Sequence, residues 1–135
     1  MHCKLQVTTH MPPRAHKPVV GPDSLRSFCP VACALDVVGD RWSLLIVRDL
    51  LQGKHRFGDF LNSPEGIPTN ILAERLRRLE SAGLISTLAY SQHPPRSEYH
   101  LTDRGHALAP VVDAMAGWGL VQFPGTRRPV RHEAH

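Results

Sequence analysis

The sequence predicts a mainly α domain with one small β-hairpin (α+β), arranged as a winged helix-turn-helix. Three features of residues 25–123 predict it. Apolar residues recur at helical spacing in several segments. A turn that contains Pro64 and Gly66 separates a short helical segment from a longer one, as in a helix-turn-helix. Two alternating segments follow directly, in the place of a wing.

The first two helices are separated by a Gly-Asp pair. Residues 30–38 are predicted to form a short helix that ends at Gly39, a residue that favours helix C-termini. Asp40 can then cap a second helix, because its carboxylate accepts hydrogen bonds from the free N–H groups of the first turn. The second helix ends at Gly53, and its apolar stripe consists of Trp42, Leu45, Ile46 and Leu50.

The helix-turn-helix is predicted over two segments. Residues 57–61 (FGDFL) have the apolar spacing of a short helix, and residues 69–82 form the longer recognition helix. Gly83 ends the recognition helix. Its core-facing residues are Leu72, Leu76 and Leu79.

The wing is predicted over residues 85–101. Residues 84–91 and 97–101 alternate as two strands, and the sequence HPPR between them is expected to form the hairpin loop. Thr102 is then expected to cap a last helix that continues through Trp118, with Pro110 as an internal interruption.

Composition and charge divide the chain into three parts. We expect a flexible, proline-rich leader over residues 1–24, one folded domain over 25–123 and a basic tail over 124–135. The net charge of +4 divides into +3 for residues 1–28, −1 for 29–126 and +2 for 127–135. The charge alone therefore does not predict that the folded domain binds DNA. No apolar run approaches a membrane span, and the N-terminus lacks a secretory signal, so we expect a cytoplasmic protein without membrane contact.

The outward face of the recognition helix carries residues suited to DNA. Short or polar residues at its N-terminus let the backbone enter the major groove, and forked donors pair with guanine or phosphate. Thr69, Asn70 and Arg77 meet these needs, and Arg75 and Arg78 are expected to contact phosphates beside the groove. The alternative interpretation is an ordinary solvated amphipathic helix.

The loop of the wing offers a second contact. Two prolines stiffen it and are expected to hold Arg96 out at its tip, and His93, on the other side of the prolines, is a further candidate DNA contact. An arginine that projects in this way suits the narrow minor groove, where the negative potential is enhanced. A proline-rich surface turn is the alternative interpretation.

The same residues resemble the HxlR-type winged helix-turn-helix transcriptional regulators, which are related to the MarR group. The resemblance runs from Cys29 to Trp118 and is carried, in order, by CPVACALDVVGDRWSLLIVRDLL, KHRFGDF, NILAERLRRLESAGLI, PPRSEYHLTDRG and PVVDAMAGWG. It implies a homodimer, built from the first and last helices, that binds double-stranded DNA at a pseudo-palindromic operator. Recognition helix 69–82 and wing 85–101 correspond to the DNA-reading elements of the family.

The dimer implied by the resemblance has a physical counterpart in the last helix. This helix has more apolar positions than a small winged domain needs to cover, so some are available for a symmetric contact. The candidate dimer residues are Val111, Val112, Met115 and Trp118. Alternatively, all four pack on their own subunit.

The three cysteines, without an export signal, indicate a reducing compartment rather than a disulfide scaffold. Cys29 stands just before the first helix, where HxlR-type regulators characteristically carry a cysteine that some members use to sense oxidants or electrophiles. A helix N-terminus lowers the pKa of a thiol, which favours the reactive thiolate. Cys33 follows at i+4, a poor disulfide geometry within a helix. Both are candidate sensing residues for an oxidant or small-molecule effector, and burial as small apolar residues is the alternative.

Other function classes find less support. No histidine is placed as a base for a cysteine nucleophile, and no phosphate loop, HExxH or paired-carboxylate motif is present, so we expect no enzyme and no cofactor. Zinc-finger spacing is also missing, so no metal site is expected. The remaining alternatives are a winged-helix protein-interaction module without DNA binding and a metal-responsive regulator.

Overall fold

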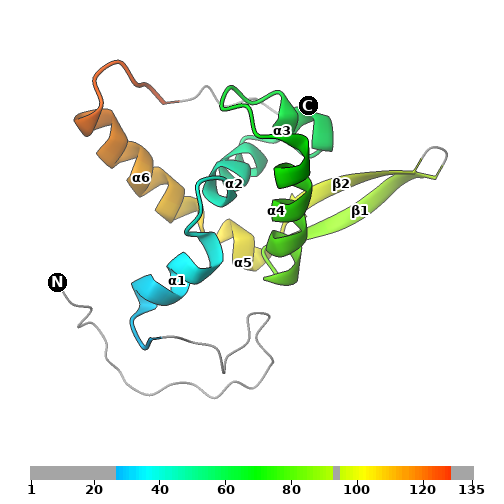
Figure 1. Cartoon of the computed structure of the whole chain (residues 1–135), viewed down its shortest axis with the longest axis horizontal. Helices are drawn as coiled ribbons and strands as arrows, with labels where there is room; N and C mark the ends of the chain where they lie inside the picture. Colours follow the sequence, from blue (N-terminus) through cyan, green and yellow to red (C-terminus); the bar gives the residue numbers. More distant parts are fainter. Residues whose placement is uncertain (1–26, 93–94, 129–135) are drawn as a thin grey trace.

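A computed structural model of the chain describes residues 27–92 and 95–128. Within them the chain forms a helical body from which a two-stranded antiparallel hairpin projects (Figure 1). The elements, in chain order, are α1 (Pro30–Val38), α2 (Ser43–Leu51), α3 (Phe57–Leu61), α4 (Thr69–Ser81), β1 (Ile85–Gln92), β2 (Pro95–Leu101), α5 (Asp103–His106) and α6 (Ala109–Gln122). The predicted winged helix-turn-helix is confirmed.

The core lies between α2, α3, α4 and the base of the hairpin. Its most deeply buried apolar side chains come from each of these elements, because each presents one apolar face to the others. They are Val47, Phe60, Leu72, Leu79 and Ile85. The three leucines that the sequence placed on the inner face of the recognition helix are all buried.

The junction between α1 and α2 has the predicted cap. The Oδ2 atom of Asp40 accepts hydrogen bonds from the backbone N–H groups of Trp42, at 2.9 Å, and Ser43, at 3.1 Å. Oδ1 accepts from the Ser43 hydroxyl at 2.5 Å. The carboxylate thereby satisfies donors that have no partner inside α2.

Two glycines lie in the turns on either side of α4. Gly66, in the turn between α3 and α4, has a φ of +70°, and Gly83, just after α4, has a φ of +79°. Residues with a side chain rarely adopt this left-handed backbone conformation, so glycine is the favoured residue at both turns. The boundaries of the helix-turn-helix thus agree with those predicted.

The prediction of HPPR as the hairpin loop was wrong in part. Pro95 and Arg96 belong to β2, where they pair with Gln92 and Ser91 of β1. A register irregularity between Ala89 and Ser91 lets the ladder continue to that point. The first residue of an edge strand tolerates proline, so two prolines in a row did not require four loop residues.

The prediction of one last helix was also wrong. Thr102 does cap a helix, since its Oγ1 accepts from the N–H of Gly105 at 3.1 Å, but that helix is the short α5. A separate helix, α6, begins at Ala109 with Pro110 in its first turn. Proline is favoured there because first-turn N–H groups need no partner within the helix. Pro110 therefore starts a helix rather than interrupting one.

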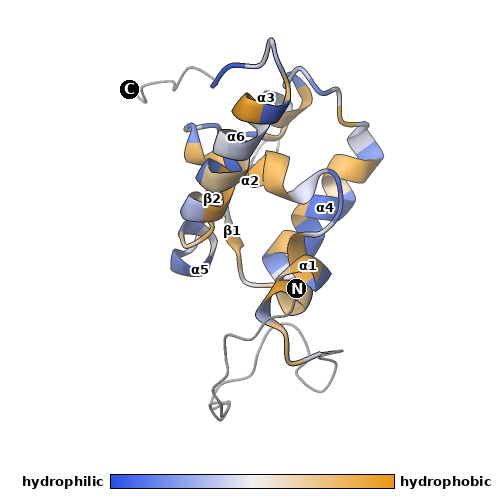
Figure 2. Ribbon diagram, turned by 90° about the vertical axis from the view of Figure 1, so that its left-hand side faces the viewer, coloured by the Kyte–Doolittle hydropathy of each residue, from blue (hydrophilic) through white to orange (hydrophobic). Residues whose placement is uncertain are grey.

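The hairpin projects on one side of the body, whereas α1 and α6 lie on the opposite side (Figure 1). Figure 2 shows that the largely apolar α1 lies at the edge of the molecule, and Val38 is its one buried residue. No helix in the described part of the chain combines the length and apolar character that crossing a bilayer requires.

Candidate nucleic-acid interface

The outward face of α4 presents the residues expected to read DNA. Thr69, Asn70, Arg77 and Arg78 all have exposed side chains. The leucine face of the same helix is turned into the core, so packing determines which side of α4 meets solvent. The structure thus brings four of the expected DNA-binding residues to one accessible helix surface.

Arg75 lies differently from these residues. Its side chain is 18% exposed, and its Nε atom donates to Oδ2 of Asp40 at 2.8 Å. A further nitrogen of the guanidinium contacts the carboxylate of Glu74. The expected phosphate contact by Arg75 stays a prediction, and in this conformation the side chain is directed to the start of α2 instead.

Asp40 is held in its charged form by these contacts. Burial by itself raises the pKa of this carboxyl, but hydrogen bonds from Ser43, Arg75 and the backbone of Trp42 outweigh it. The pKa of Asp40 therefore lies well below its usual range. The charged carboxylate is the form that pairs with Arg75.

The wing carries Arg96 on β2, with its side chain exposed. Since residues 93–94 are not described, the expected role of His93 lies outside the described residues. Arg96 lines an open groove between α3 and the hairpin, together with Asn62 and Tyr90. The groove places polar side chains of the wing and of the helix-turn-helix next to each other.

The base of the wing is attached to the segment before α3. The backbone of Arg56 bridges to Glu98 of β2, and the N–H of Tyr99 donates to the carbonyl of His55 at 2.8 Å. The guanidinium of Arg56 lies 4.5 Å from the centre of the Tyr90 ring and pairs with Glu98 at 3.6 Å. These contacts fix the direction in which the hairpin leaves the body.

Sequence reasoning missed Arg56 as a residue of this interface. It lies in KHRFGDF, one residue before a short helix, and the approach of β2 to that segment is a long-range pairing. A basic residue directly before the first helix of a helix-turn-helix was the available signal.

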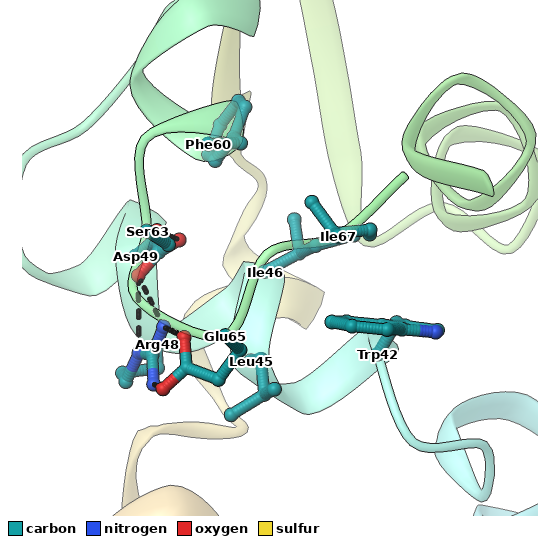
Figure 3. A pocket seen from close by; sticks show the side chains of 9 residues that line it. All are labelled: Trp42, Leu45, Ile46, Arg48, Asp49, Phe60, Ser63, Glu65 and Ile67. Carbon is teal, nitrogen blue, oxygen red and sulfur yellow. Dashed lines mark hydrogen bonds and ion pairs between the residues drawn. The ribbon is translucent and has the colours of Figure 1, made fainter. Parts of the chain in front are cut away.

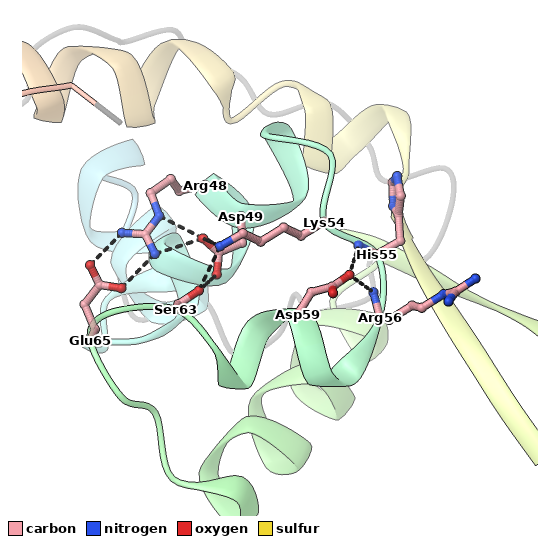
Figure 4. Close-up of polar contacts among 8 residues, drawn as sticks. All are labelled: Arg48, Asp49, Lys54, His55, Arg56, Asp59, Ser63 and Glu65. Carbon is pink, nitrogen blue, oxygen red and sulfur yellow. Dashed lines mark hydrogen bonds and ion pairs between the residues drawn. The ribbon is translucent and has the colours of Figure 1, made fainter. Parts of the chain in front are cut away.

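A polar cluster ties the turn between α3 and α4 to α2 (Figures 3 and 4). Arg48 of α2 donates through two nitrogens to the carboxylate of Glu65, at 2.9 and 2.8 Å. Asp49, which is buried, accepts from the Ser63 hydroxyl at 2.5 Å and from Arg48. Lys54 lies 3.6 Å from the same carboxylate. Directional bonds of this kind hold the turn, and with it the N-terminus of α4, against α2.

Beside that cluster lies a small apolar pocket, drawn in Figure 3. Trp42, the residue before α2, and Ile46 of α2 face Phe60 and Ile67 across it, so the turn contacts this part of the chain through apolar as well as polar groups. The two kinds of contact act on the same short segment and together make it a rigid base for α4.

Three of the four expected dimer residues are exposed in the single chain. Val111, Met115 and Trp118 are exposed by 42%, 56% and 63%, whereas Val112 is half-buried and lines a cleft with Leu51 of α2. Among the described residues, α6 has none in the buried class. Exposed apolar side chains also lie on and just before α1, namely Phe28, Val31 and Leu35.

The two described cysteines have different environments. Cys29 is the residue before α1 and is disulfide-bonded. Cys33 is a free, half-buried thiol whose Sγ donates to the carbonyl of Ser27 at 3.2 Å. Cys29 and Cys33 are thus not bonded to each other. Within residues 27–92 and 95–128, His, Cys, Asp and Glu side chains form no group of three or more placed to hold a metal ion.

A helix-turn-helix with an exposed, arginine-bearing second helix, followed at once by a β-hairpin, defines the class of winged-helix DNA-binding proteins. The chain belongs to the HxlR-like helix-turn-helix family, whose model matches residues 37–126. The resemblance found in the sequence is thereby confirmed.

Individual relatives support the assignment. The uncharacterised HTH-type transcriptional regulator sll1512 of Synechocystis sp. is 41% identical over 88 residues, a stretch that is 65% of this chain and 65% of that protein. The oxidised redox regulator HypR superposes with a TM-score of 0.64 at 36% identity, covering 76% of this chain and 100% of that one. A candidate MarR-family transcriptional regulator from Porphyromonas gingivalis W83 gives a TM-score of 0.66 at 31% identity, over 71% and 94% of the two chains.

These comparisons make the protein a transcriptional regulator of the HxlR type and not an enzyme. One of these structural relatives, HypR, is a redox regulator.

Proposed function

We propose that the protein acts as a homodimer that reads a pseudo-palindromic operator, with α4 in the major groove and the wing in the adjacent minor groove. The observation that carries the proposal is the exposed polar face of α4, fixed by its buried leucines and followed directly by the hairpin. Two such helices, one turn of DNA (~34 Å) apart, would match two half-sites.

The roles follow from side-chain chemistry and position. Thr69 and Asn70 lie at the N-terminus of α4, the end that enters the groove, and Arg77 offers a forked donor for guanine. Arg78 is assigned to a phosphate contact. Arg96 is assigned to the minor groove.

Arg77→Ala tests base reading. We expect it to weaken binding to the cognate duplex by about 1–3 kcal/mol and to relax the preference for that sequence. A mobility shift with the DNA upstream of the protein's own gene, against a scrambled duplex, measures both. Equal losses on the two duplexes would make Arg77 a phosphate contact. The matched control is Arg128→Ala. Arg128 is paired with Asp113 of α6, and this variant should bind both duplexes as tightly as the wild type does.

Arg96→Ala tests the wing. Loss of a phosphate-neutralising arginine should weaken binding to both duplexes and flatten the dependence of affinity on salt, whose slope changes by about 0.9 for each phosphate contact. A slope equal to that of the wild type would remove Arg96 from the interface. If the wild type shifts no duplex even at low salt, the winged helix serves protein interaction instead, and the proposal fails.

The dimer is proposed to form through α6 and α1. Val111, Met115 and Trp118 leave a large apolar area exposed on α6, and Val31 and Leu35 do the same on α1. Exposed apolar patches of this kind mark interaction surfaces, and a symmetric dimer would bury them without a second protein.

Redox or electrophile control through Cys29 is the effector proposal. It is supported by the place of Cys29 before α1, in the region proposed for dimer contact, and by similarity to the redox regulator HypR. Because Cys29 is disulfide-bonded, the test first reduces wild type, Cys29→Ser and Cys33→Ser with dithiothreitol, then treats them with diamide and measures operator binding before and after. Cys29→Ser should lose the response to oxidant, and Cys33→Ser should keep it. A Cys29→Ser protein that responds as the wild type does would contradict the proposal.

A further inference from the structure

Arg75 is set apart from the other arginines of α4 by its partner. Arg77 and Arg78 have exposed side chains, whereas Arg75 is 18% exposed and is bound to Asp40 through Nε at 2.8 Å. The pair joins α4 to a residue 35 positions earlier in the chain. An arginine that contacts phosphate needs its guanidinium free to reach solvent, and this one is engaged inside the protein.

Asp40 is a rigid partner. Its two carboxylate oxygens accept hydrogen bonds from the backbone and the hydroxyl of the first turn of α2, between 2.5 and 3.1 Å. Ser43, the donor of that hydroxyl, is 1% exposed and cannot move without the helix. Arg75 is therefore attached to the fixed end of α2 and not to a mobile surface side chain.

The attachment supplies something that the core contacts of α4 lack. Leu72, Leu76 and Leu79 hold α4 by apolar contact, which is not directional and permits small rotations about the helix axis. A charge-assisted hydrogen bond depends on distance and angle. Because Arg75 lies beside Leu76 on the helix, this bond fixes how far the opposite face turns toward DNA.

We propose that Arg75 is a positioning residue: its bond to Asp40 sets the rotation of α4, so that Asn70 and Arg77 face the bases, and it does not itself bind phosphate. The inference rests on the proposed DNA-reading function. It replaces the phosphate contact that the sequence predicted for Arg75, and it adds Asp40, a residue outside the helix-turn-helix, to those that determine operator choice.

The experiment measures binding of a fluorescent duplex, recovered from random DNA by selection with the wild type, at a series of salt concentrations. Asp40→Asn keeps a capping acceptor for α2 but removes the charge that holds Arg75. We expect Asp40→Asn and Arg75→Ala each to bind the selected duplex roughly tenfold more weakly. The slope of the logarithm of affinity against the logarithm of salt concentration should equal that of the wild type. The ratio of the affinity for the selected duplex to that for a scrambled duplex should fall. The double variant should be no weaker than either single variant, because both remove the same bond.

Arg75→Lys separates the two roles. Lysine keeps the charge for a phosphate but has no Nε–H in the geometry that Asp40 uses, so a positioning role predicts weak binding and a phosphate contact predicts wild-type binding. Arg78→Ala serves as the matched control, with a slope expected to fall by about 0.9. Circular dichroism and thermal unfolding verify that each variant is folded. If Arg75→Ala is not folded, the binding data for Arg75→Lys are used instead.

The inference is overturned if Arg75→Ala lowers the salt slope as Arg78→Ala does. It is also overturned if Asp40→Asn, which removes the charge that pairs with Arg75, binds as tightly as the wild type. A wild type that selects no sequence from random DNA would instead contradict the proposed function. Even then, additive effects of Asp40→Asn and Arg75→Ala on the free energy of unfolding would show that the bond itself does not hold α4.

Discussion

At the scale of the residue, Gly105 has no room for a side chain. A Cβ atom there would lie 2.1 Å from the carbonyl oxygen of Leu84 and 2.8 Å from a methyl group of Leu101. The first of these is backbone between α4 and β1 and cannot turn aside. Glycine at this position lets α5 approach the base of the hairpin.

Gly105→Ala is therefore expected to lower the free energy of unfolding by about 1–3 kcal/mol, because α5 must move away from the hairpin. Urea denaturation measures the change. Gly58→Ala in α3 is the control, since a Cβ there meets no described atom within 4 Å. Alanine should be neutral or stabilising at that position, by up to about 1 kcal/mol. Equal losses for the two variants would show that the contact at Leu84 is not the cause.

At the scale of the element, one of the contacts that hold the turn between α3 and α4 is the ion pair between Arg48 and Glu65. Hydrogen bonding from Arg48 lowers the pKa of Glu65 and outweighs the opposing effect of burial. A carboxyl whose pKa is lower in the folded than in the unfolded protein stabilises the fold above its unfolded pKa, about 4.3 for Glu. That contribution is lost as the pH falls below this value.

The wild type is accordingly expected to be more stable than Glu65→Gln at pH 7, with the difference shrinking as the pH falls below about 4. Urea unfolding at a series of pH values measures it. Glu80→Gln, at an exposed position of α4, is the control for the loss of one acidic side chain outside the turn. A difference between wild type and Glu65→Gln that is constant with pH would mean that the charge of Glu65 does not act through this pair.

At the scale of the whole molecule, the exposed apolar face of α6 sets the expected assembly. Met115→Glu places a charge on a side chain that is 56% exposed in the single chain, so the protomer should stay folded while the dimer dissociates. Light scattering coupled to size-exclusion chromatography measures the mass, and operator affinity should fall together with it. Val112→Ala, at the cleft toward α2, should weaken the protomer's own fold but leave the dimer. An unchanged mass for Met115→Glu would exclude α6 as the dimer contact.

Local patterns were sufficient for most of the elements and for the face of α4. Helical spacing placed Leu72, Leu76 and Leu79 inward, and the same spacing placed Asn70 and Arg77 outward, because burial repeats with the helical period. Asp40 was identified as a cap from its position after Gly39 alone. The HxlR-type resemblance rested on these same stretches and is confirmed by the family match.

Long-range contacts determined the remainder. The bridge from Arg56 to Glu98 and the bond from Arg75 to Asp40 both join residues far apart in the chain. The spacing of residues along the chain does not indicate which distant group an arginine will contact. An arginine on the margin of a helix has the same local pattern whether it faces a phosphate or a carboxylate, and only the packing of α2 against α4 distinguishes the two.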